Sequence, residues 1–317
     1  MELVSLEHLV REDHMYRKFA SVFDFDDLVT PIMSLSNDGL VGKTGYGIVR
    51  LFKCLLLQFM EDISDRELER FMAENVAAKW FCGFNLGDST PDFSLFSKVR
   101  ARIGTKKLSQ IFAKARDQPK KKGYMSEVFT FVDASHLVSK SALWEERDKA
   151  IAEGLEKLNN STVDKVAVDK DAKFGCKGKT KFWYGYKRHA SVDMRSGLIN
   201  KIAITPANVT DSAGVKHICP RSGTVFGDKA YGVGPAKRII KAKGCHSSAI
   251  LKNNMKDKNR DLDRWRTKMR APHESVFSKM NHRARYRSTT KNQFAAFFDG
   301  LSFNMKRAIV LHKLYGF

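Results

Sequence analysis

The chain has 317 residues, 43% of them hydrophobic and 29% charged, which excludes a disordered or collagen-like protein and leaves room for about two domains. Its most apolar stretch, residues 48–60, contains Arg50, Lys53 and Gln58 and is too short to span a bilayer, so we expect a soluble protein. Residues 1–20 lack the apolar core of a secretory signal, which predicts a cytoplasmic location where the five scattered cysteines stay reduced.

Positive charge is concentrated in the C-terminal two-thirds of the chain. The 56 Lys and Arg residues outnumber the 35 Asp and Glu residues, for a net charge of +21. Residues 1–100 carry a net charge of −5 and residues 101–317 carry +26. A basic field of this size favours binding of a polyanion, most commonly nucleic acid. The alternative is a basic solvated surface that only keeps the protein soluble.

Residues 1–120 are predicted to form a helical domain. Apolar residues recur there at helical spacing, and Ser64 with Glu67 has the pattern of a capping box. Helices are expected at residues 48–60, from 64 onward, at 71–81 and at 93–103. The last helix would carry Lys98, Arg100 and Arg102 on one face, which favours a DNA-binding module of the helix-turn-helix kind. Because the first hundred residues are net acidic, a helical dimerisation or packing domain is the open alternative.

A second domain, residues 121–317, is expected to follow. The boundary falls in the segment 116–124, which combines a proline, a glycine and a run of lysines. Beyond this segment the hydrophobic pattern changes to that of an α/β domain. Residues 140–181 are expected to be a charged insertion, with a helix at 144–158 and then an exposed loop.

Strands and helices follow one another in this domain, which predicts a mixed α/β sheet with flanking helices. Residues 193–197 have the composition of a hairpin turn, and either Thr210 or Asp211 should cap the next helix. Gly244 should end the helix after that. Strands are expected at 128–132, 182–192, 198–205, 224–227 and 248–251. The helix that Gly244 should end is expected at 233–243.

Three acidic residues are candidates for chemistry. Asp133 is expected at the end of the first strand, Asp228 after a later strand and Glu274 at the start of a helix, 95 and 46 residues apart. Active sites of open α/β sheets gather at the carboxyl ends of strands. Such acids would repel one another unless divalent cations neutralised them, and two Mg²⁺ or Mn²⁺ ions suit these hard oxygen ligands. A metal pair could then promote in-line attack on a phosphodiester.

Two further carboxylates are rivals with local explanations. Asp193 lies in the predicted hairpin turn and Asp211 at the predicted helix cap, so each has a sufficient structural role. The histidines show no metal-ligand spacing, which argues against histidine ligation.

Around these acids the chain resembles the DDE transposases of bacterial insertion sequences, in the type-four and type-five superfamily and closest to the type-five group. The similar segments, in order, are ISDRELE (63–69), DSTPDFSLFSKVRARIG (88–104), FVDAS (131–135), KFWYGYKRHASVD (181–193), ITPANVTDS (204–212), GDKAYG (227–232) and RAPHESVF (270–277). The resemblance implies an RNase H-like fold on which Asp133, Asp228 and Glu274 form the catalytic, metal-binding triad. It also implies cleavage of the element's ends, joining of the 3′-hydroxyl to target DNA, no organic cofactor, a homodimer in the synaptic complex and association with the nucleoid.

The chain departs from the superfamily pattern around Glu274. Arg270 fits that pattern, but Thr267 stands at its tyrosine position and Asn281 at its lysine position, with Lys279 two residues early. Roles assigned to that tyrosine and lysine therefore do not transfer. The 46 residues between Asp228 and Glu274 also leave little room for the β-rich insertion of some relatives.

Basic residues near the acids are candidate contacts to DNA phosphates. Trp265, within a lysine- and arginine-rich run, is a candidate for stacking on a base. For each cation singly, a solvated surface charge is an equal alternative. The candidate DNA-binding residues are Lys187, Arg188, Lys229, Arg264, Trp265, Arg266, Arg270, Arg283 and Arg285.

Two other functions stay open at this point. One is a two-metal nuclease of the same fold that does not transfer strands. The other is a captured, non-catalytic DNA-binding protein of the repressor kind, although the acids present at all three positions argue against it.

Overall fold

The structure is a computed structural model that describes residues 5–37, 45–141, 159–178, 181–278 and 280–315. The helix expected at 144–158 and the side chain of Lys279 lie outside these residues. The chain divides into two compact units, one of residues 1–122 with 297–317 and the other of residues 123–296. The first unit thus takes in a C-terminal segment that the sequence pattern had assigned to the second domain.

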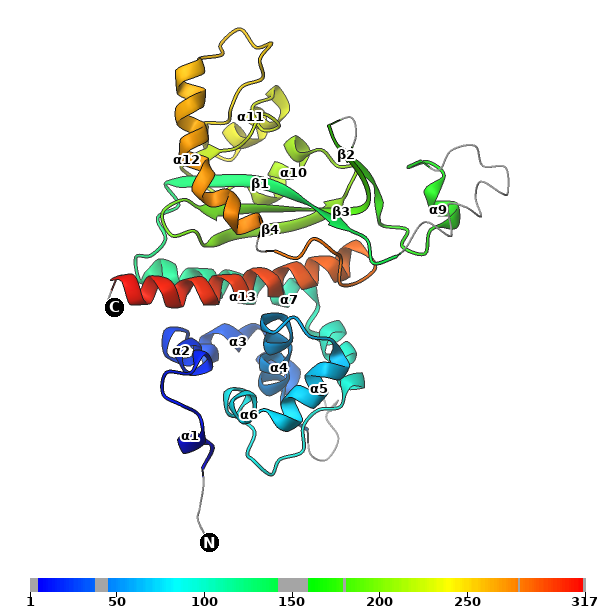
Figure 1. Ribbon diagram of the computed structural model, residues 1–317, viewed down its shortest axis with the longest axis vertical. Helices are drawn as coiled ribbons and strands as arrows, with labels where there is room; N and C mark the ends of the chain where they lie inside the picture. The colour runs from blue at the N-terminus through cyan, green and yellow to red at the C-terminus, as the bar shows by residue number, and fades with distance from the viewer. Residues whose placement is uncertain (1–4, 38–44, 142–158, 179–180, 279, 316–317) are drawn as a thin grey trace. The chain divides into compact units, whose positions relative to one another are not determined.

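The first unit is helical, as predicted (Figure 1). Its core forms around α4, whose Phe52 and Phe59 rings lie 5.6 and 4.9 Å from the ring of Phe298 on α13. No helix among the described residues is both long and apolar enough to cross a membrane. The elements are α1 (Leu6–Leu9), α2 (Met15–Val22), α3 (Phe25–Met33), η1 (Ser34–Asn37), α4 (Ile48–Met60), α5 (Asp65–Glu74), α6 (Val76–Cys82), α7 (Phe93–Lys121) and the part of α13 (Thr289–Tyr315) from residue 297 onward.

Local signals located most of these helices. The helix expected at 48–60 is α4, and the capping box of Ser64 and Glu67 opens α5. The helix expected at 71–81 is α6, but it starts five residues later than predicted, because the Asn75 side chain accepts a hydrogen bond from Ala78 N–H and caps it, and residues 71–74 belong to α5. The helix expected at 93–103 is the first part of α7. A kink at Gly104, which has a φ of +63°, interrupts α7 at the predicted end, and the helix then continues to Lys121.

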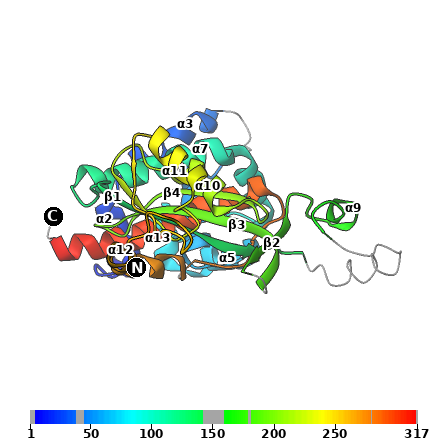
Figure 2. The same ribbon diagram turned by 90° about the horizontal axis from the view of Figure 1, so that it is seen from above.

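The second unit is built on a six-stranded mixed sheet, the RNase H-like arrangement expected from the resemblance (Figures 1 and 2). β3 pairs antiparallel with β1 on one edge and with β4 and β2 on the other, while β5 and β6 continue the sheet beyond β1 in parallel. The strands are β1 (Phe129–Val138), β2 (Lys173–Lys177), β3 (Lys181–Asp193), β4 (Ile199–Pro206), β5 (Thr224–Phe226) and β6 (His246–Ser247).

Helices cover both faces of this sheet, as Figure 2 shows. On one face α10 (Asp211–Ile218) and α11 (Gly234–Ala242) pack on a buried cluster that includes Val132 of β1. On the other face α12 (Arg260–Ser278) lies over Phe131 of β1, whose ring is 5.8 Å from that of Phe277. A short helix, α9 (Val163–Val166), precedes β2. Neighbouring residues of β1 therefore face opposite layers.

Several predicted boundaries in this unit are wrong. β1 does not end at Asp133 but runs five residues further, because it stays paired with β3 as far as Val138. The loop expected before β3 contains strand β2, and the strand expected at 248–251 is β6, two residues earlier. Glu274 lies near the end of α12 rather than at its start, and Pro272 lies inside that helix.

Candidate active site

Asp133 and Asp228 occupy matching positions on two adjacent parallel strands. Phe131 of β1 and Phe226 of β5 are the last paired residues, and each aspartate follows its paired phenylalanine by two residues. Beyond this point the two strands are no longer joined, which opens the sheet where both carboxylates lie. Asp228 thus follows the carboxyl end of β5, as the rule for open α/β sheets predicts, whereas Asp133 lies within β1 at the point where β1 and β5 part.

The surroundings of Asp133 disfavour its negative charge. Burial, and to a smaller extent the nearby charges of Asp228 and Asp211, raise the pKa of its carboxyl group to about 6. The hydrogen bond that its Oδ1 accepts from Ala134 N–H, at 2.8 Å, and the charge of Lys177 act in the opposite direction. A carboxylate held among other carboxylates is an environment that a divalent cation would relieve.

Asp228 is held in a tight turn. Its Oδ1 accepts a hydrogen bond of 2.8 Å from Ala230 N–H, and its carbonyl oxygen accepts one of 3.1 Å from Tyr231 N–H. The turn needs glycine at Gly232, because a Cβ there would lie 2.2 Å from the carbonyl oxygen of Ile250. The GDKAYG segment thus fixes the direction of the Asp228 side chain.

Glu274 is carried on the helix that covers the same side of β1. His273 and Phe277 both lie against the ring of Phe131, at 6.3 and 5.8 Å, and Phe131 shares its side of the strand with Asp133. The half-exposed Glu274 carboxylate forms an ion pair of 2.9 Å with Arg270. Within the described residues, no three Asp, Glu, His or Cys side chains are grouped closely enough to hold a metal ion. The structure therefore brings two of the three acids together and places the third on the neighbouring helix.

The donor set of the aspartate pair fits a hard divalent cation. Two carboxylates, placed where β1 and β5 part, would supply oxygen ligands and leave coordination positions open for water and phosphate oxygens. Asp228 is held by a backbone hydrogen bond that leaves other carboxylate lone pairs available. Asp133 and Asp228 are the residues that would hold Mg²⁺ or Mn²⁺.

The two rival carboxylates differ in the structure. Asp193 has the local role expected, since it accepts hydrogen bonds from Ser196 N–H, Ser196 Oγ–H and Glu127 N–H in the hairpin turn. Asp211 does not cap its helix, because the cap is Thr210. Asp211 instead pairs with Lys187 at 2.8 Å and lies close enough to Asp133 to affect its pKa. Its place beside the site depends on the packing of α10 against the sheet, which no local pattern reveals.

The nine candidate DNA-binding residues divide by exposure. Arg188 is only 3% exposed, because β3 lies inside the sheet with both edges paired, so a phosphate contact by this residue is not supported. Lys187 and Arg266 are largely buried and paired with Asp211 and Asp263. Trp265 is 47% exposed, and its ring lies 5.8 Å from that of Phe226. The exposed members are Lys229, Arg264, Trp265 and Arg283, and the half-buried ones are Arg270 and Arg285.

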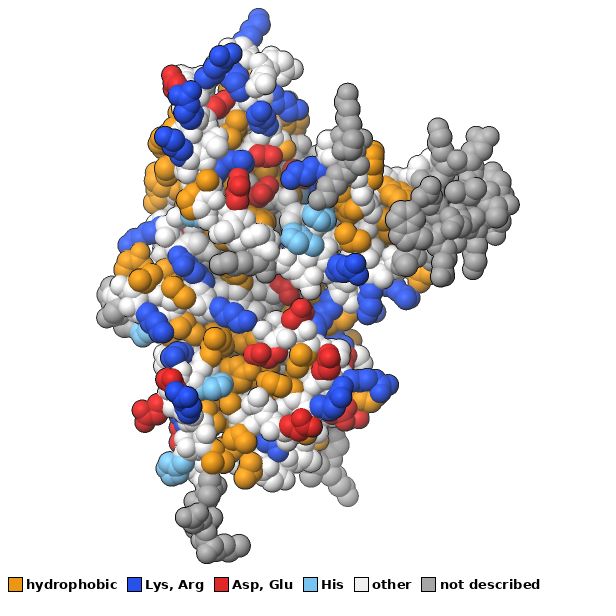
Figure 3. Space-filling model, viewed as in Figure 1, with side chains coloured by type: hydrophobic (Ala, Val, Ile, Leu, Met, Phe, Trp, Pro, Cys, Tyr) orange, Lys and Arg blue, Asp and Glu red, His pale blue; other side chains and the backbone are white. Residues whose placement is uncertain are grey.

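A basic groove adjoins Asp228. It has a volume of about 530 Å³ and includes Lys229, the residue after Asp228. Figure 3 shows Lys and Arg side chains gathered around α12 and the segment before it, with a group of acidic side chains beneath them. The groove is lined by Lys229, Ile250, Asn253, Lys258, Arg260, Asp263, Arg264 and Thr267.

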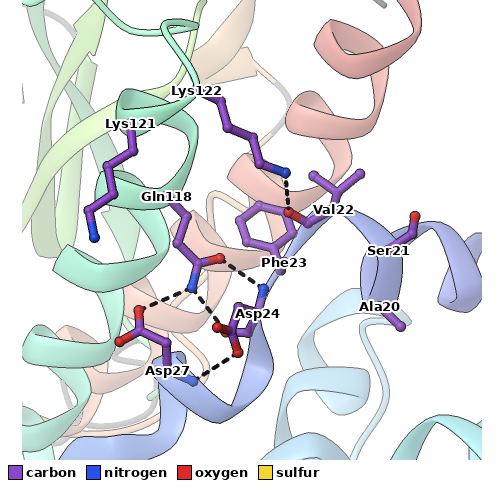
Figure 4. Close-up of a pocket in the computed structure, with 9 residues that line it drawn as sticks. All are labelled: Ala20, Ser21, Val22, Phe23, Asp24, Asp27, Gln118, Lys121 and Lys122. Atoms are coloured by element: carbon purple, nitrogen blue, oxygen red, sulfur yellow. Dashed lines mark hydrogen bonds between the residues drawn. The ribbon is translucent and has the colours of Figure 1, made fainter. Parts of the chain in front are cut away.

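A cavity in the first unit carries no comparable chemistry. Its volume is about 490 Å³ (Figure 4), and its polar groups bond to one another. The Gln118 amide accepts a hydrogen bond from Asp24 N–H at 3.1 Å and donates one to Asp24 O at 2.9 Å, while Lys122 donates to Val22 O at 3.0 Å. These bonds join the end of α7 to the start of α3, which is a structural role.

The basic face predicted on α7 is mostly engaged within the first unit. Arg100 pairs with Asp65 at 2.5 Å, and Arg102 donates to Leu35 O at 2.7 Å. Of the three cations expected to read DNA there, Lys98 is the exposed one. These contacts favour the packing alternative over the helix-turn-helix hypothesis.

Two family models match the chain. A family model described as a Transposase DDE domain matches residues 126–297, and one described as a Transposase domain (DUF772) matches residues 4–102. The chain is also similar to a solved structure, the cryo-EM structure of a piggyBac transposase synaptic complex with hairpin DNA. That likeness has a TM-score of 0.35 at 9% identity and covers 77% of this chain and 52% of the other, so the chain spans about half the length of its match. No curated protein matches the chain.

Proposed function

The chain belongs to the DDE transposases, and from this premise we propose that it cuts DNA at the ends of its mobile element and joins the freed 3′-hydroxyl to target DNA. The observation that carries this proposal is the matched placement of Asp133 and Asp228 after the last paired residues of β1 and β5. Two successive phosphoryl transfers at one site would use the same carboxylates each time.

The three acids are proposed to bind the metal ions. Asp133 and Asp228 would hold two Mg²⁺ or Mn²⁺ ions, which when bound activate the attacking oxygen and stabilise the leaving oxygen. Glu274 would complete the triad as its third carboxylate ligand once it leaves its ion pair with Arg270. Because that pair is half-exposed, the exchange costs little.

The basic groove is proposed as the path of the DNA strand that leaves the site. Lys229 lies next to Asp228, and Arg260 and Arg264 line the groove further along. These side chains are placed to contact successive backbone phosphates. Trp265, half-exposed beside the end of β5, would stack on a base.

The proposed partners are the element's terminal inverted repeats and target DNA. Bringing two ends together calls for two active sites, so a homodimer in the synaptic complex is part of the proposal, as is association with the nucleoid. Most of the helical first unit matches the family model described as a Transposase domain (DUF772). We propose that this unit serves in end binding or dimerisation.

A cleavage and joining assay tests the proposal. The purified protein is incubated with Mg²⁺ and DNA that carries the inverted repeats flanking its reading frame, together with a supercoiled target. We expect nicked ends and joined products from the wild type, and DNA binding without either product from Asp133→Asn, Asp228→Asn and Glu274→Gln. Asp164→Asn is the control, because this carboxylate is exposed on α9 and pairs with Lys173, outside both the aspartate site and the basic groove.

The products separate the alternatives. Cleavage without joining would identify a two-metal nuclease. Binding with no product from the wild type, at any divalent cation concentration, would identify a non-catalytic DNA-binding protein. Cleavage by Asp133→Asn at the wild-type rate would refute the site assignment.

A further inference from the structure

Asp263 of α12 places a buried carboxylate among the cations of the basic groove. Among the described residues that line the groove it alone is acidic, and only 6% of it is exposed. A negative charge beside a path for the DNA backbone should repel that backbone. Burial of a carboxylate also costs free energy unless hydrogen bonds and charged partners compensate for it. The presence of this acid in the groove therefore calls for an explanation.

The Asp263 carboxylate joins α12 to the segment that precedes it, residues 251–258. Its Oδ1 accepts hydrogen bonds from Arg266 Nη1 at 3.1 Å and from Leu251 N–H at 3.4 Å, and its Oδ2 forms an ion pair of 3.3 Å with Lys258 Nζ. Burial acts to raise the pKa of the carboxyl group, but the bonds from these three residues outweigh it and hold the pKa below its usual range. Asp263 is therefore charged at neutral pH and holds the segment against the helix.

Lys258 closes this segment on its own start. Its Nζ donates hydrogen bonds to Leu251 O at 3.1 Å and to Asn253 Oδ1 at 2.9 Å, in addition to its ion pair with Asp263. An ammonium group has three N–H donors, and these three oxygens engage all of them. Lys258 therefore shapes the groove rather than contacting a phosphate.

The start of the segment is fixed to the turn that carries Asp228. Ile250 N–H donates a hydrogen bond of 3.1 Å to Gly227 O, at the beginning of the GDKAYG turn. Asp263 binds the next residue along the chain and so links α12 to that turn. Because of this link, Lys229 of the turn and Arg264 of the helix line the same groove.

We propose that Asp263 is a positioning residue for DNA: it holds the segment 251–258 against α12 and so keeps the groove in the shape in which its cations contact successive phosphates. The inference rests on the proposed function, since it takes the groove as the path of the DNA strand. The expected effect is opposite to that of simple charge. Removal of an acid from a basic surface normally strengthens DNA binding, whereas removal of Asp263 should weaken it.

The test measures binding of a random-sequence duplex to the full-length protein by fluorescence anisotropy in EDTA, where the metal site does not contribute. Asp263→Asn keeps an Oδ1 acceptor for Arg266 and Leu251 but loses the charge that pairs with Lys258. Affinity varies with salt concentration to the power of about −0.9 for each phosphate contact, so loss of one contact lowers affinity about eightfold at about 0.1 M salt. We expect at least this loss from Asp263→Asn.

Asp193→Asn is the matched control. It removes the same charge from another buried carboxylate of the second unit, one that hydrogen bonds hold in the hairpin turn and that is not among the described residues lining the groove. It should bind DNA at least as tightly as wild type. Melting curves of every variant, followed by circular dichroism, set a temperature at which each is folded.

A double variant, Asp263→Asn with Lys258→Gln, leaves the net charge unchanged. If the two residues acted only through their charges, its DNA affinity would equal that of wild type. We expect it to bind as weakly as Asp263→Asn, because both variants release the segment 251–258 from α12. The double variant also removes the buried pair as a unit, so it carries the test if Asp263→Asn does not fold.

Three results would overturn the inference: DNA binding by Asp263→Asn as tight as that of wild type or tighter, wild-type affinity of the double variant, or an equal loss in Asp193→Asn. The last would show that destabilisation of the unit explains the loss. Arg264→Gln keeps the two levels of the proposal apart. If Arg264→Gln binds DNA as wild type does, the groove is not the strand path; if it binds more weakly while Asp263→Asn does not, only the positioning role is wrong.

Discussion

Gly214 of α10 lies directly against the imidazole ring of His189 on β3. A Cβ added at Gly214 would lie 2.2 Å from Cε1 and 2.4 Å from Nδ1 of that ring. His189 is fully buried, and its Nε2 is 2.9 Å from the Thr205 hydroxyl. The helix that carries Asp211 therefore reaches the sheet only because residue 214 has no side chain.

Gly214→Ala should consequently destabilise the second unit. The added methyl group overlaps a ring that the hydrogen bond to Thr205 holds in place, and such overpacking costs about 1–3 kcal/mol. Urea unfolding measures the change. Gly234→Ala is the matched control, since a Cβ there meets nothing within 4 Å. Equal stability of the two variants would show that α10 can shift away from β3 freely.

Burial also makes His189 a source of acid sensitivity. Its pKa is lowered to about 4, first by burial and then by the charges of Lys187 and His217, against the opposing charge of Asp211. The unfolded chain binds this proton near pH 6.5, so the stabilisation is complete above that pH and is lost as the pH falls toward 4. A shift of this size corresponds to roughly 3 kcal/mol. Unfolding free energies between pH 7 and 4 should fall less steeply for His189→Gln than for wild type, and parallel curves would contradict this.

Local signals in the sequence located much of the fold. Caps at Ser64 and Thr210, the turn at Asp193 and the glycine after α11 act through hydrogen bonds within a few residues, so their patterns are readable in the chain itself. Errors arose where distant contacts decide the outcome. β1 continues past Asp133 only because β3 pairs with it, and Arg188 is buried for the same reason.

The site was predictable only in part for a related reason. The sequence pattern supplied the acids, and the pairing of β1 with β5 supports the grouping of Asp133 with Asp228. The Lys187–Asp211 pair and the buried Asp263 carboxylate arise from the packing of α10 on the sheet and of α12 on the segment before it. No spacing rule predicts such packing between segments.

Replacing Asp133 should stabilise the metal-free protein while abolishing cleavage. Burial is the main reason that the pKa of Asp133 is about 6 in the folded protein, above the ordinary 3.8. The charge of Asp133 therefore lowers the free energy of unfolding fully once the pH has risen through 6, and has no effect below about pH 3.8. Two pKa units correspond to roughly 3 kcal/mol. In EDTA, Asp133→Asn should melt higher than wild type at pH 8 but not at pH 4. A uniform gain at both pH values would mean that the charge of Asp133 is not the cause.

The basic groove predicts a difference between two cations on α12. Arg264 lines the groove beside Lys229, whereas Lys268, one turn further along, is exposed and outside it. A phosphate contact releases counterions, so its loss should lower the slope of log affinity against log salt by about 1. For a duplex of random sequence, Arg264→Gln should show this smaller slope and weaker binding, measured by fluorescence anisotropy from 50 to 300 mM NaCl, while Lys268→Gln should match wild type. Equal losses of DNA affinity in both variants would mean that α12 attracts DNA through its overall charge. The proposal that the groove is a defined path for the DNA strand would then be wrong.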